Sequence, residues 1–422
     1  MQFNKFERFL ALTLSRFPLI KLKLKKIYQN INFFIYKKKY SIKTDYKITK
    51  ISTNHAESFF GYYDKSPINA TNKFVVFLST DSNTKNLPNN KIPINIVLYD
   101  IINDVYEIIG QSNTYNWQQG AKTMWLNEFE FIYNDFDYEN NNYISKIFNV
   151  AKKEEKVFQY PIYDCFKDCY ALTLNFDRLS ILRPDYGYTI KNKNLKIDWN
   201  NSNDGIYFLD FSSNEQKLIL SIQDAINLHP KDNMNGAKHK FNHIMISPDG
   251  AKFMFLHRWF LSGRKFDRLI VADINGENAS IISDDDMVSH CFWIDNENIF
   301  GFLRQHRVGD KYYSINIYSK NKVIIGGGVI DCFGDGHPNI FKKNIVFDTY
   351  PDKSRMKGLY LYNLQSNQLM KLGEFFENFD FYGETRCDLH PRFSIDGQKI
   401  FFDSVHNGSR SLYMLEGFYG NK

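Results

Sequence analysis

Short apolar runs separated by polar turn residues recur at a regular interval along the second half of the chain. The first run of each unit begins near residue 241, 288, 335 or 388, in FNHIMI, VSHCFWI, GHPNIF and LHPRFSI. A second run follows in KFMFLH, IFGFLR, NIVFD and KIFFD, and a third in DRLIVADI, YSINIYS, GLYLYNL and SLYML. Short runs rich in β-branched and aromatic residues, bounded by Gly, Asp and Asn, predict β-strands.

These units predict the blades of a β-propeller. Repeats of roughly 40 to 50 residues with three or four short strands each are typical of that architecture. Weaker copies of the unit precede the clear ones, at residues 62–77, 119–137, and 169–183 together with 205–211. We therefore predict an all-β, seven-bladed β-propeller over residues 45–422, with a short basic helical extension over residues 1–44.

Two further segments complete this predicted ring. The apolar run at residues 46–53 is expected to supply the strand that closes the ring against the last blade. Residues 223–240 contain Pro230 and Gly236, which indicates an irregular crossing between blades three and four. With 43% hydrophobic residues the chain can bury a large core, so a disordered protein is excluded.

The positive charge is confined to the N-terminal extension. The formal net charge is +6, but residues 1–40 alone carry ten Lys or Arg and one acid, Glu7. A nucleic-acid binder would spread its cations over the folded body, so we expect no nucleic-acid partner. The apolar stretches here are far shorter than the roughly 20 residues needed to span a bilayer. Two interpretations remain: the extension binds an anionic membrane surface through residues 1–40, or it packs on the propeller.

The cysteines indicate a reducing compartment. The chain has five, and none forms a C-x-x-C pair. An odd, scattered set without a signal peptide is typical of reduced thiols. We expect a cytoplasmic protein, held at the inner membrane face if the extension binds lipid.

Four histidines occupy the same position in successive units. His243, His290, His337 and His390 are spaced by 47, 47 and 53 residues, each at the start of a first run. In a propeller blade the first strand lines the channel and the second runs antiparallel to it. The start of the first strand therefore lies beside the end of the second, where we find His257, Arg304, Asp348 and Asp403. All of these side chains are expected at one mouth of the channel.

This convergence predicts a functional pocket. A single buried histidine is usually a satisfied core residue, but four of the chain's ten histidines share one register. Imidazoles from adjacent blades are good ligands for Mn, Zn, Fe or Ni, and a carboxylate such as Asp388 or Asp64 would complete such a site. Alternatively, the histidines act without metal, as acid, base and hydrogen-bond donors to an anionic ligand. No G-x-S-x-G nucleophile motif is present.

The motifs LHPRFSIDGQKIFFDS (389–404) and GHPNIFKKNIVFDT (336–349) resemble blades of the oligogalacturonate lyases. These are seven-bladed propellers with a histidine-ligated divalent metal at the channel mouth, and their repeats resemble those of Tol-system propellers. The likeness covers blades four to seven well and blades one to three weakly. The chain departs from the pattern in carrying one such histidine in each of four blades rather than a tight cluster.

The resemblance implies β-elimination on a uronic-acid-containing glycan. That reaction needs a group that neutralises the carboxylate, a base at the α-proton and an acid at the leaving oxygen. The resemblance assigns neutralisation of the substrate carboxylate to Arg392 and Arg304. The base would be His243, His290 or His390, and the acid would be Tyr62 or Tyr63. The metal would be a divalent ion, Mn, Zn, Fe or Ni, on His243, His290, His337 and His390. The expected substrate-binding residues are Arg258, Arg386, Trp259, Asp64, Asp388 and His257.

A non-catalytic interpretation stands beside this one. A propeller tethered by a basic amphipathic segment could bind glycan, or act as a scaffold, in surface-polysaccharide biosynthesis. Trp259, Trp293 and Tyr350 would then stack on sugars. Such a scaffold is expected to show an exposed apolar patch, whereas an enzyme needs the full polar group at one mouth.

Overall fold

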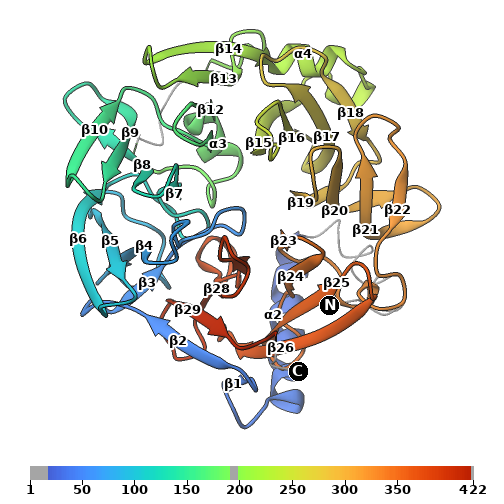
Figure 1. Ribbon diagram of the computed structural model, residues 1–422. Coiled ribbons are helices and arrows are strands. Elements are labelled where there is room, and N and C mark those ends of the chain that lie inside the picture. Colours follow the sequence, from blue (N-terminus) through green and yellow to red (C-terminus); the bar gives the residue numbers. More distant parts are fainter. Residues whose placement is uncertain (1–17, 191–197, 420–422) are drawn as a thin grey trace.

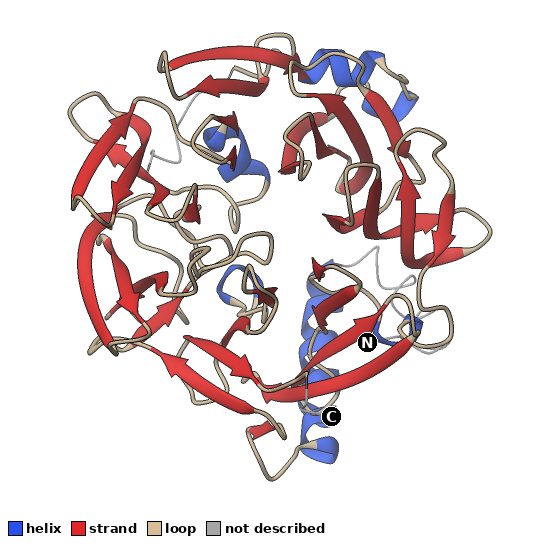
Figure 2. Ribbon diagram, viewed as in Figure 1, coloured by secondary structure: helices blue, strands red, loops and turns tan. Residues whose placement is uncertain are grey.

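The apolar runs form seven antiparallel sheets arranged radially around a central channel (Figure 1; Figure 2). The computed structural model describes residues 18–190 and 198–419. The seven-bladed β-propeller predicted from the sequence is confirmed. In each blade the first strand is innermost, and each following strand lies further out.

The first four blades follow one another along the chain. Blade one comprises β3 (Glu57–Phe59), β4 (Phe74–Thr80), β5 (Ile94–Asp100) and β6 (Val105–Ser112). Blade two comprises β7 (Met124–Trp125), β8 (Glu130–Asp137), β9 (Asn142–Asn149) and β10 (Glu154–Phe158). Blade three comprises β11 (Asp164–Phe166), β12 (Tyr170–Leu174), β13 (Gly205–Asp210) and β14 (Glu215–Ser221). Blade four comprises β15 (Lys238–Ile246), β16 (Lys252–Leu261), β17 (Arg264–Asp273) and β18 (Ser280–Ser283).

Blade five follows the same order, and the last two blades each gain a strand from the N-terminal side of the chain. Blade five comprises β19 (Val288–Trp293), β20 (Asn298–Gln305), β21 (Gly309–Asn316) and β22 (Lys322–Ile324). Blade six comprises β23 (Asn339–Phe341), β24 (Asn344–Asp348), β25 (Met356–Asn363), β26 (Gln368–Phe376) and β1 (Ile42–Lys43). Blade seven comprises β27 (Arg392–Phe393), β28 (Ile400–Ser404), β29 (Ser411–Glu416) and β2 (Lys47–Ile51).

Strand β2 closes the ring as the sequence predicted. It runs antiparallel to β29, with Ile51 opposite Leu412 and Lys47 opposite Glu416. Residues near the two ends of the described chain therefore share one sheet. Strand β1, at residues assigned from the sequence to the extension, pairs with β26 instead.

Helices are few and lie outside the sheets. The described helices are α2 (Pro18–Tyr36), α3 (Phe176–Leu182) and α4 (Ile222–Asn227), with 3-10 turns η2 (Asp232–Met234), η3 (Asp331–Phe333) and η4 (Gly383–Thr385). The Asn175 side chain caps α3, and Ser221 forms a capping box at α4. The segment 223–240, predicted as an irregular crossing, contains all of α4 except its first residue, and the whole of η2. None of the helices in the described ranges is long and apolar enough to span a bilayer.

The cores lie between neighbouring blades. Along β16, Phe253 and Phe255 pack into the core shared with blade three, whereas Met254 and Leu256 pack into the core shared with blade five. This follows from the alternation of side chains along a strand, which gives each sheet two buried faces. Each blade is thereby held on both sides, and the channel-facing residues are fixed by packing behind them.

The innermost strand of blade one is interrupted. The sequence placed the first two strands of this blade within residues 62–77, but β3 ends at Phe59 and the chain pairs again only at Ile68, opposite Val75. Gly61 has a φ of 126°, and a side chain there would collide with the backbone of Gln119. The intervening residues form a loop that carries Tyr62 and Tyr63 to the centre of the histidine group.

Candidate active site

The four register histidines surround one tyrosine. The Tyr63 ring centroid lies 5.9 Å from that of His243, 5.7 Å from His290, 5.6 Å from His337 and 6.3 Å from His390. Tyr63 is fully buried. Its hydroxyl donates to the Cys291 carbonyl at 3.0 Å and lies 3.1 Å from His243 Nε2. Tyr63 therefore holds blades four and five at the centre of the molecule and has no free hydroxyl for a ligand.

Two of these histidines adopt a left-handed backbone. The φ angle is 58° at His243 and 44° at His390. Non-glycine residues in this region cost about 1–3 kcal/mol, and such strain gathers at functional sites. At His243 the strain coincides with a register shift between β15 and β16. The backbone is distorted at the points where it aims an imidazole at the channel.

His337, Asp388 and His390 form a group that could hold a metal ion. One potential ligand atom from each lies within 4.8 Å of the others, and all three residues are buried. Among the described residues, the Nε2 atoms of His337 and His390 have no hydrogen-bond partner. A buried polar atom without a partner is costly, so two such nitrogens beside a carboxylate are available to coordinate a metal. Two imidazole nitrogens and one carboxylate oxygen suit Mn, Fe or Zn.

Asp348 positions both histidine ligands. Its carboxylate accepts hydrogen bonds from the His337 backbone N–H at 2.7 Å and from the His390 backbone N–H at 3.1 Å. It also lies 2.9 Å from His337 Nδ1. Burial opposes protonation of His337, but the Asp348 charge and these hydrogen bonds outweigh it and raise the pKa of His337. With Nδ1 directed at the carboxylate, Nε2 is the nitrogen that faces the metal group.

The third ligand is held as a charged carboxylate. Lys357 Nζ lies 3.1 Å from Asp388 Oδ1, and Arg386 Nε donates to Oδ2 at 2.7 Å. Burial disfavours the charged form, but these two cations hold the pKa of Asp388 well below its usual range. Burial and the neighbouring His337 hold the pKa of His390 well below its usual range. Asp388 and His390 are therefore held in the deprotonated form that a metal needs.

His243 and His290 lie outside this group. His243 Nε2 is 3.0 Å from the Cys291 carbonyl, and burial together with His290 lowers the pKa of His243 to about 3. His290 Nδ1 lies 3.2 Å from Asp335 Oδ1, and burial together with His337 lowers the pKa of His290. The His290 and His337 rings are nevertheless adjacent, with centroids 4.1 Å apart. His290 is thus a neutral imidazole beside the metal group, oriented by a carboxylate.

A cavity of about 200 Å³ opens beside His290. Its wall carries three cations that come from blades three and four, namely Arg183, Arg258 and Lys265. The remaining lining residues are Tyr62, Tyr186, Asn242, His243, Ser289, His290, Asp335 and Tyr350. The Tyr62 and Tyr186 hydroxyls are 3.4 Å apart, and burial followed by Tyr186 raises the pKa of Tyr62 well above its usual value. The cavity therefore suits an anionic ligand and faces the protonated phenol of Tyr62.

Lys240 adds a buried amine beside these cations. It stands opposite Arg258 in the β15–β16 pairing and is only 1% exposed. Among the described residues its Nζ has no hydrogen-bond partner. Burial, with the charges of Arg258 and Arg183, lowers the pKa of Lys240 well below its usual value. Lys240 therefore loses its proton more readily than an ordinary lysine, beside Arg258 of the cavity wall.

Several residues expected at the site serve other contacts. Arg304 pairs with Asp310 through two hydrogen bonds and is partly exposed, away from the histidines. Arg392 is fully buried and pairs with Asp403, whose carboxylate also accepts from the backbone of blade one. Asp64 lies 3.8 Å from Lys122. Neither arginine is placed to meet a ligand in the cavity.

The aromatic and histidine candidates of blade four are also interior residues. His257 lies between His239, at 2.9 Å, and Arg268, at 3.1 Å. Trp259 is fully buried and packs on Phe266. Trp293 is buried and donates to the Met245 carbonyl. Of the three aromatic residues expected to stack on sugar, Tyr350 alone lines the cavity.

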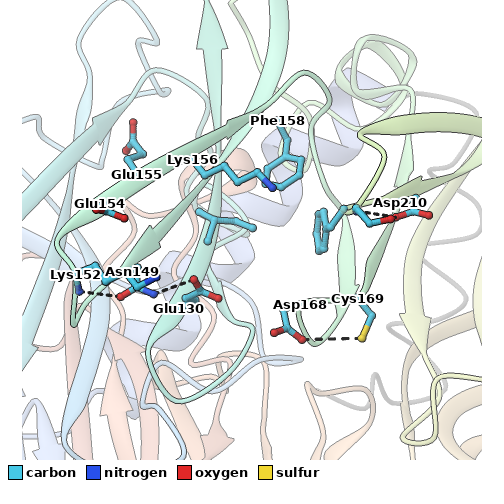
Figure 3. A pocket seen from close by; sticks show the side chains of 13 residues that line it. Glu130, Asn149, Lys152, Glu154, Glu155, Lys156, Phe158, Asp168, Cys169 and Asp210 are labelled. Carbon is cyan, nitrogen blue, oxygen red and sulfur yellow. Dashed lines mark hydrogen bonds between the residues drawn. The ribbon is translucent and has the colours of Figure 1, made fainter.

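A second, larger cleft of about 520 Å³ lies between blades two and three. Figure 3 shows Glu130 of β8, together with Asp168 and Cys169 from the turn before β12, facing this cleft. None of the four register histidines lines it. The chemistry-bearing groups are at the channel mouth, so we place the candidate site there.

Comparisons with known proteins agree with the fold. No family model matches the chain, and no curated protein matches it in sequence. An oligogalacturonate lyase in complex with manganese has a similar structure, with a TM-score of 0.63 and 14% identity over 90% of this chain and 95% of that one. The oligogalacturonate lyase of Vibrio parahaemolyticus gives 0.62 and 14% over 90% and 98%.

A more distant likeness is to TolB from Acinetobacter baumannii, with a TM-score of 0.39 and 11% identity over 81% of this chain and 79% of that one. The resemblance to oligogalacturonate lyases inferred from the blade motifs is therefore confirmed at the level of the fold. The chain is a seven-bladed β-propeller of the shape found in oligogalacturonate lyases.

Proposed function

We propose that the protein is a metal-dependent lyase that cleaves a uronic-acid-containing glycan by β-elimination at the channel mouth. The observation that carries the proposal is the pair of unpaired Nε2 atoms on His337 and His390, grouped with the Asp388 carboxylate. A bound divalent ion, manganese in the similar lyase structure, would act there as a Lewis acid on the substrate. The cation-lined cavity adjoins this group through His290, Tyr62 and Tyr350.

The residues of the cavity meet the three needs of the reaction. Arg183, Arg258 and Lys265 offer positive charge to the uronate carboxylate, which acidifies the proton on the adjacent carbon. His290 supplies the base, because its Nδ1 faces Asp335 and its lowered pKa keeps it neutral. Tyr62, whose raised pKa keeps it protonated, offers a proton to the leaving oxygen, and the Tyr186 hydroxyl lies 3.4 Å from it. The C–O bond breaks as the new C=C bond forms, and no oxidant is needed.

This allocation replaces the arginines proposed from the sequence. All four arginines have a carboxylate partner, but only Arg183, paired with Asp185, and Arg258, paired with Asp267, line the cavity. Tyr63 is likewise replaced by Tyr62, because only Tyr62 lines the cavity. His337 and His390 keep their place as ligands.

A binding protein without turnover is the second candidate. The observation that favours it is the burial of the cavity phenols: Tyr62 is 5% exposed and Tyr186 is 3% exposed. A glycan bound over such a wall would meet few groups able to exchange protons. In that case the metal and the cations would fix the ligand and nothing more.

The test is to incubate the full chain, with and without Mn²⁺, with a panel of uronic-acid polysaccharides and oligosaccharides and to follow the ultraviolet absorbance of unsaturated product. We expect turnover that chelation abolishes. His290→Gln should lower it by about 10²–10⁴-fold while leaving Mn²⁺ binding in place. His306→Gln, an exposed histidine of the same blade, is the control. Ligand binding without product would establish the second candidate and reject the lyase.

A further inference from the structure

Helix α2 presents a stripe of apolar side chains to solvent. Leu24, Ile27, Ile31, Phe34 and Ile35 are 43%, 54%, 56%, 77% and 64% exposed. At 3.6 residues per turn these positions fall within an arc of about 100° on the helix. A continuous apolar stripe of this kind is costly in water and marks an interaction surface.

The opposite side of α2 is fixed to the propeller. Phe33 stacks on Phe376 at 5.7 Å and meets Phe379 edge-on at 5.5 Å. Asn32 is buried. One side of the helix is already packed on blade six. The exposed stripe is therefore a second face, which the described residues of the propeller do not cover. The sequence left membrane binding and packing as alternatives, and α2 shows packing on one face and exposure on the other.

Helix α2 lies on the side of the propeller that carries the histidine site. Residues 351–355, in the loop between β24 and β25, share a narrow cleft with Tyr28, Gln29 and Asn32 of α2. The same loop begins with Tyr350, which lines the histidine cavity. Figure 1 shows α2 crossing blade six in the view along the channel, which agrees with a position on this flat face. A surface that binds the stripe would therefore face the channel mouth.

Positive charge accompanies the stripe. Lys25, Lys26, Lys37, Lys38 and Lys39 are all exposed, and residues 24–44 contain no Asp or Glu. An apolar stripe bordered by lysines, with Tyr36 at its end, matches the boundary between anionic headgroups and acyl chains. A protein partner would require no such excess of one charge. The combination selects an anionic bilayer over a second copy of this chain, whose own α2 would repel it.

We propose that α2 binds the surface of an anionic membrane through the stripe of Leu24, Ile27, Ile31, Phe34 and Ile35, and so holds the channel mouth at the bilayer. The helix lies in the interface and does not cross it. This inference is independent of the reaction at the site. It implies that the glycan is met at the membrane surface.

The test is flotation of the full chain with vesicles of phosphatidylcholine alone and of phosphatidylcholine with phosphatidylglycerol. We expect binding to the anionic vesicles that high salt weakens. The pair Ile31→Ser with Phe34→Ser should weaken that binding on the order of 100-fold, because two side chains no longer enter the acyl region. Lys38→Gln with Lys39→Gln should weaken it by about fivefold for each charge removed.

The matched control is Ile102→Ser with Tyr318→Ser, which removes equally exposed apolar side chains from blades one and five. It should bind vesicles as the parent chain does. The proposal is overturned if the parent chain fails to float with anionic vesicles, or if the Ile31/Phe34 variant binds as well as the control. It is equally overturned if light scattering shows a dimer that this variant abolishes. No glycan enters the assay, so the result does not depend on the proposed lyase activity.

Discussion

Replacing Asp348 with asparagine tests whether the His337–His390 pair is a metal site. The carboxylate accepts from two backbone N–H groups, those of His337 and His390, and both its oxygens lie within 3.1 Å of His337 Nδ1. Asparagine keeps one acceptor oxygen and turns the other into an NH2 group that cannot accept. At least one buried donor must then lose its partner, and the His337 ring loses the contact that directs Nε2 toward Asp388.

The expected losses of folding free energy and of metal affinity follow from what such contacts contribute in other proteins. A buried donor left without a partner costs about 1–3 kcal/mol of folding free energy. Loss of a carboxylate that orients a metal-bound histidine typically lowers metal affinity about 10–100-fold. We therefore expect Asp348→Asn to fold, to unfold at lower urea concentration, and to bind Mn²⁺ 10–100-fold more weakly, as measured by titration calorimetry.

The matched control is Asp164→Asn in blade three. Asp164 is fully buried and accepts from the backbone N–H groups of Ile246 and Cys165, both at 2.8 Å. Because Asp164 also pairs with Lys65 at 2.5 Å, this variant should lose at least as much stability, yet keep the Mn²⁺ affinity of the parent chain. If folded Asp348→Asn binds Mn²⁺ as tightly as the parent, the group at His337 and His390 is not the metal site.

Three other outcomes are expected. Burial lowers the pKa of His239 and of His406 to about 4, against about 6.5 in the unfolded chain, so the unfolded state binds more protons below pH 6.5. Each histidine should therefore cost about 2 kcal/mol of unfolding free energy between pH 7 and pH 5, and a urea midpoint that does not fall over this interval would contradict the assignment. Lys240→Met should stabilise the fold by about 1–3 kcal/mol, because it removes an unpaired buried amine, and a lower urea midpoint would show that the amine is satisfied. Ile51→Ala should cost about 2–4 kcal/mol and speed hydrogen exchange in β29, since Ile51 is 2% exposed at the closing strand, and unchanged exchange would show that β2 does not hold the ring.

The repeat period predicted the architecture because it reflects packing alone. Apolar runs at fixed spacing, with polar turns between them, leave few ways to bury both faces of every sheet. Blades four to seven were placed near residues 241, 288, 335 and 388, and the structure has their first strands beginning at or within four residues of these positions. Blade one was placed less well, because its inner strand contains the loop that carries Tyr62 and Tyr63. An interruption of that kind serves the site and leaves no periodic signal.

The sequence predicted which histidines converge at the channel mouth, but not which role each of them has. Register brought His243, His290, His337 and His390 to one mouth, but the role of each depends on what its two ring nitrogens meet. His243 Nε2 is occupied by Tyr63 and Cys291, whereas His337 and His390 keep a free Nε2. Such partners come from distant blades and cannot be deduced from spacing. Arg183 ends the segment 169–183 that was assigned to blade three, but it caps α3 rather than a strand, and nothing in the repeat pointed to its place at the cavity.

One missed relation was visible in the repeat. Asp335 and Asp388 each stand two residues before a register histidine, in DGH and DLH. Each reaches the histidine of the preceding blade: Asp335 lies 3.2 Å from His290, and Asp388 is grouped with His337. The carboxylate of one blade thus contacts the imidazole of the one before it, and the two pairs correspond to the proposed acid–base group and the proposed metal group.

This arrangement makes the site a property of the closed ring. Asp388 and His390 belong to blade seven, and Tyr62 and Tyr63 belong to blade one. Strand β2, which leads into blade one, pairs with β29 inside blade seven and so joins the two. His390 Nδ1 lies 2.9 Å from the carbonyl of Gly61, and Asp403 of blade seven accepts from the backbone N–H of the same glycine. The contacts that orient a proposed metal ligand therefore cross the seam of the propeller. If the seam opens, His390 loses its support before the other blades change, so metal binding depends on closure more directly than the fold of any single blade does.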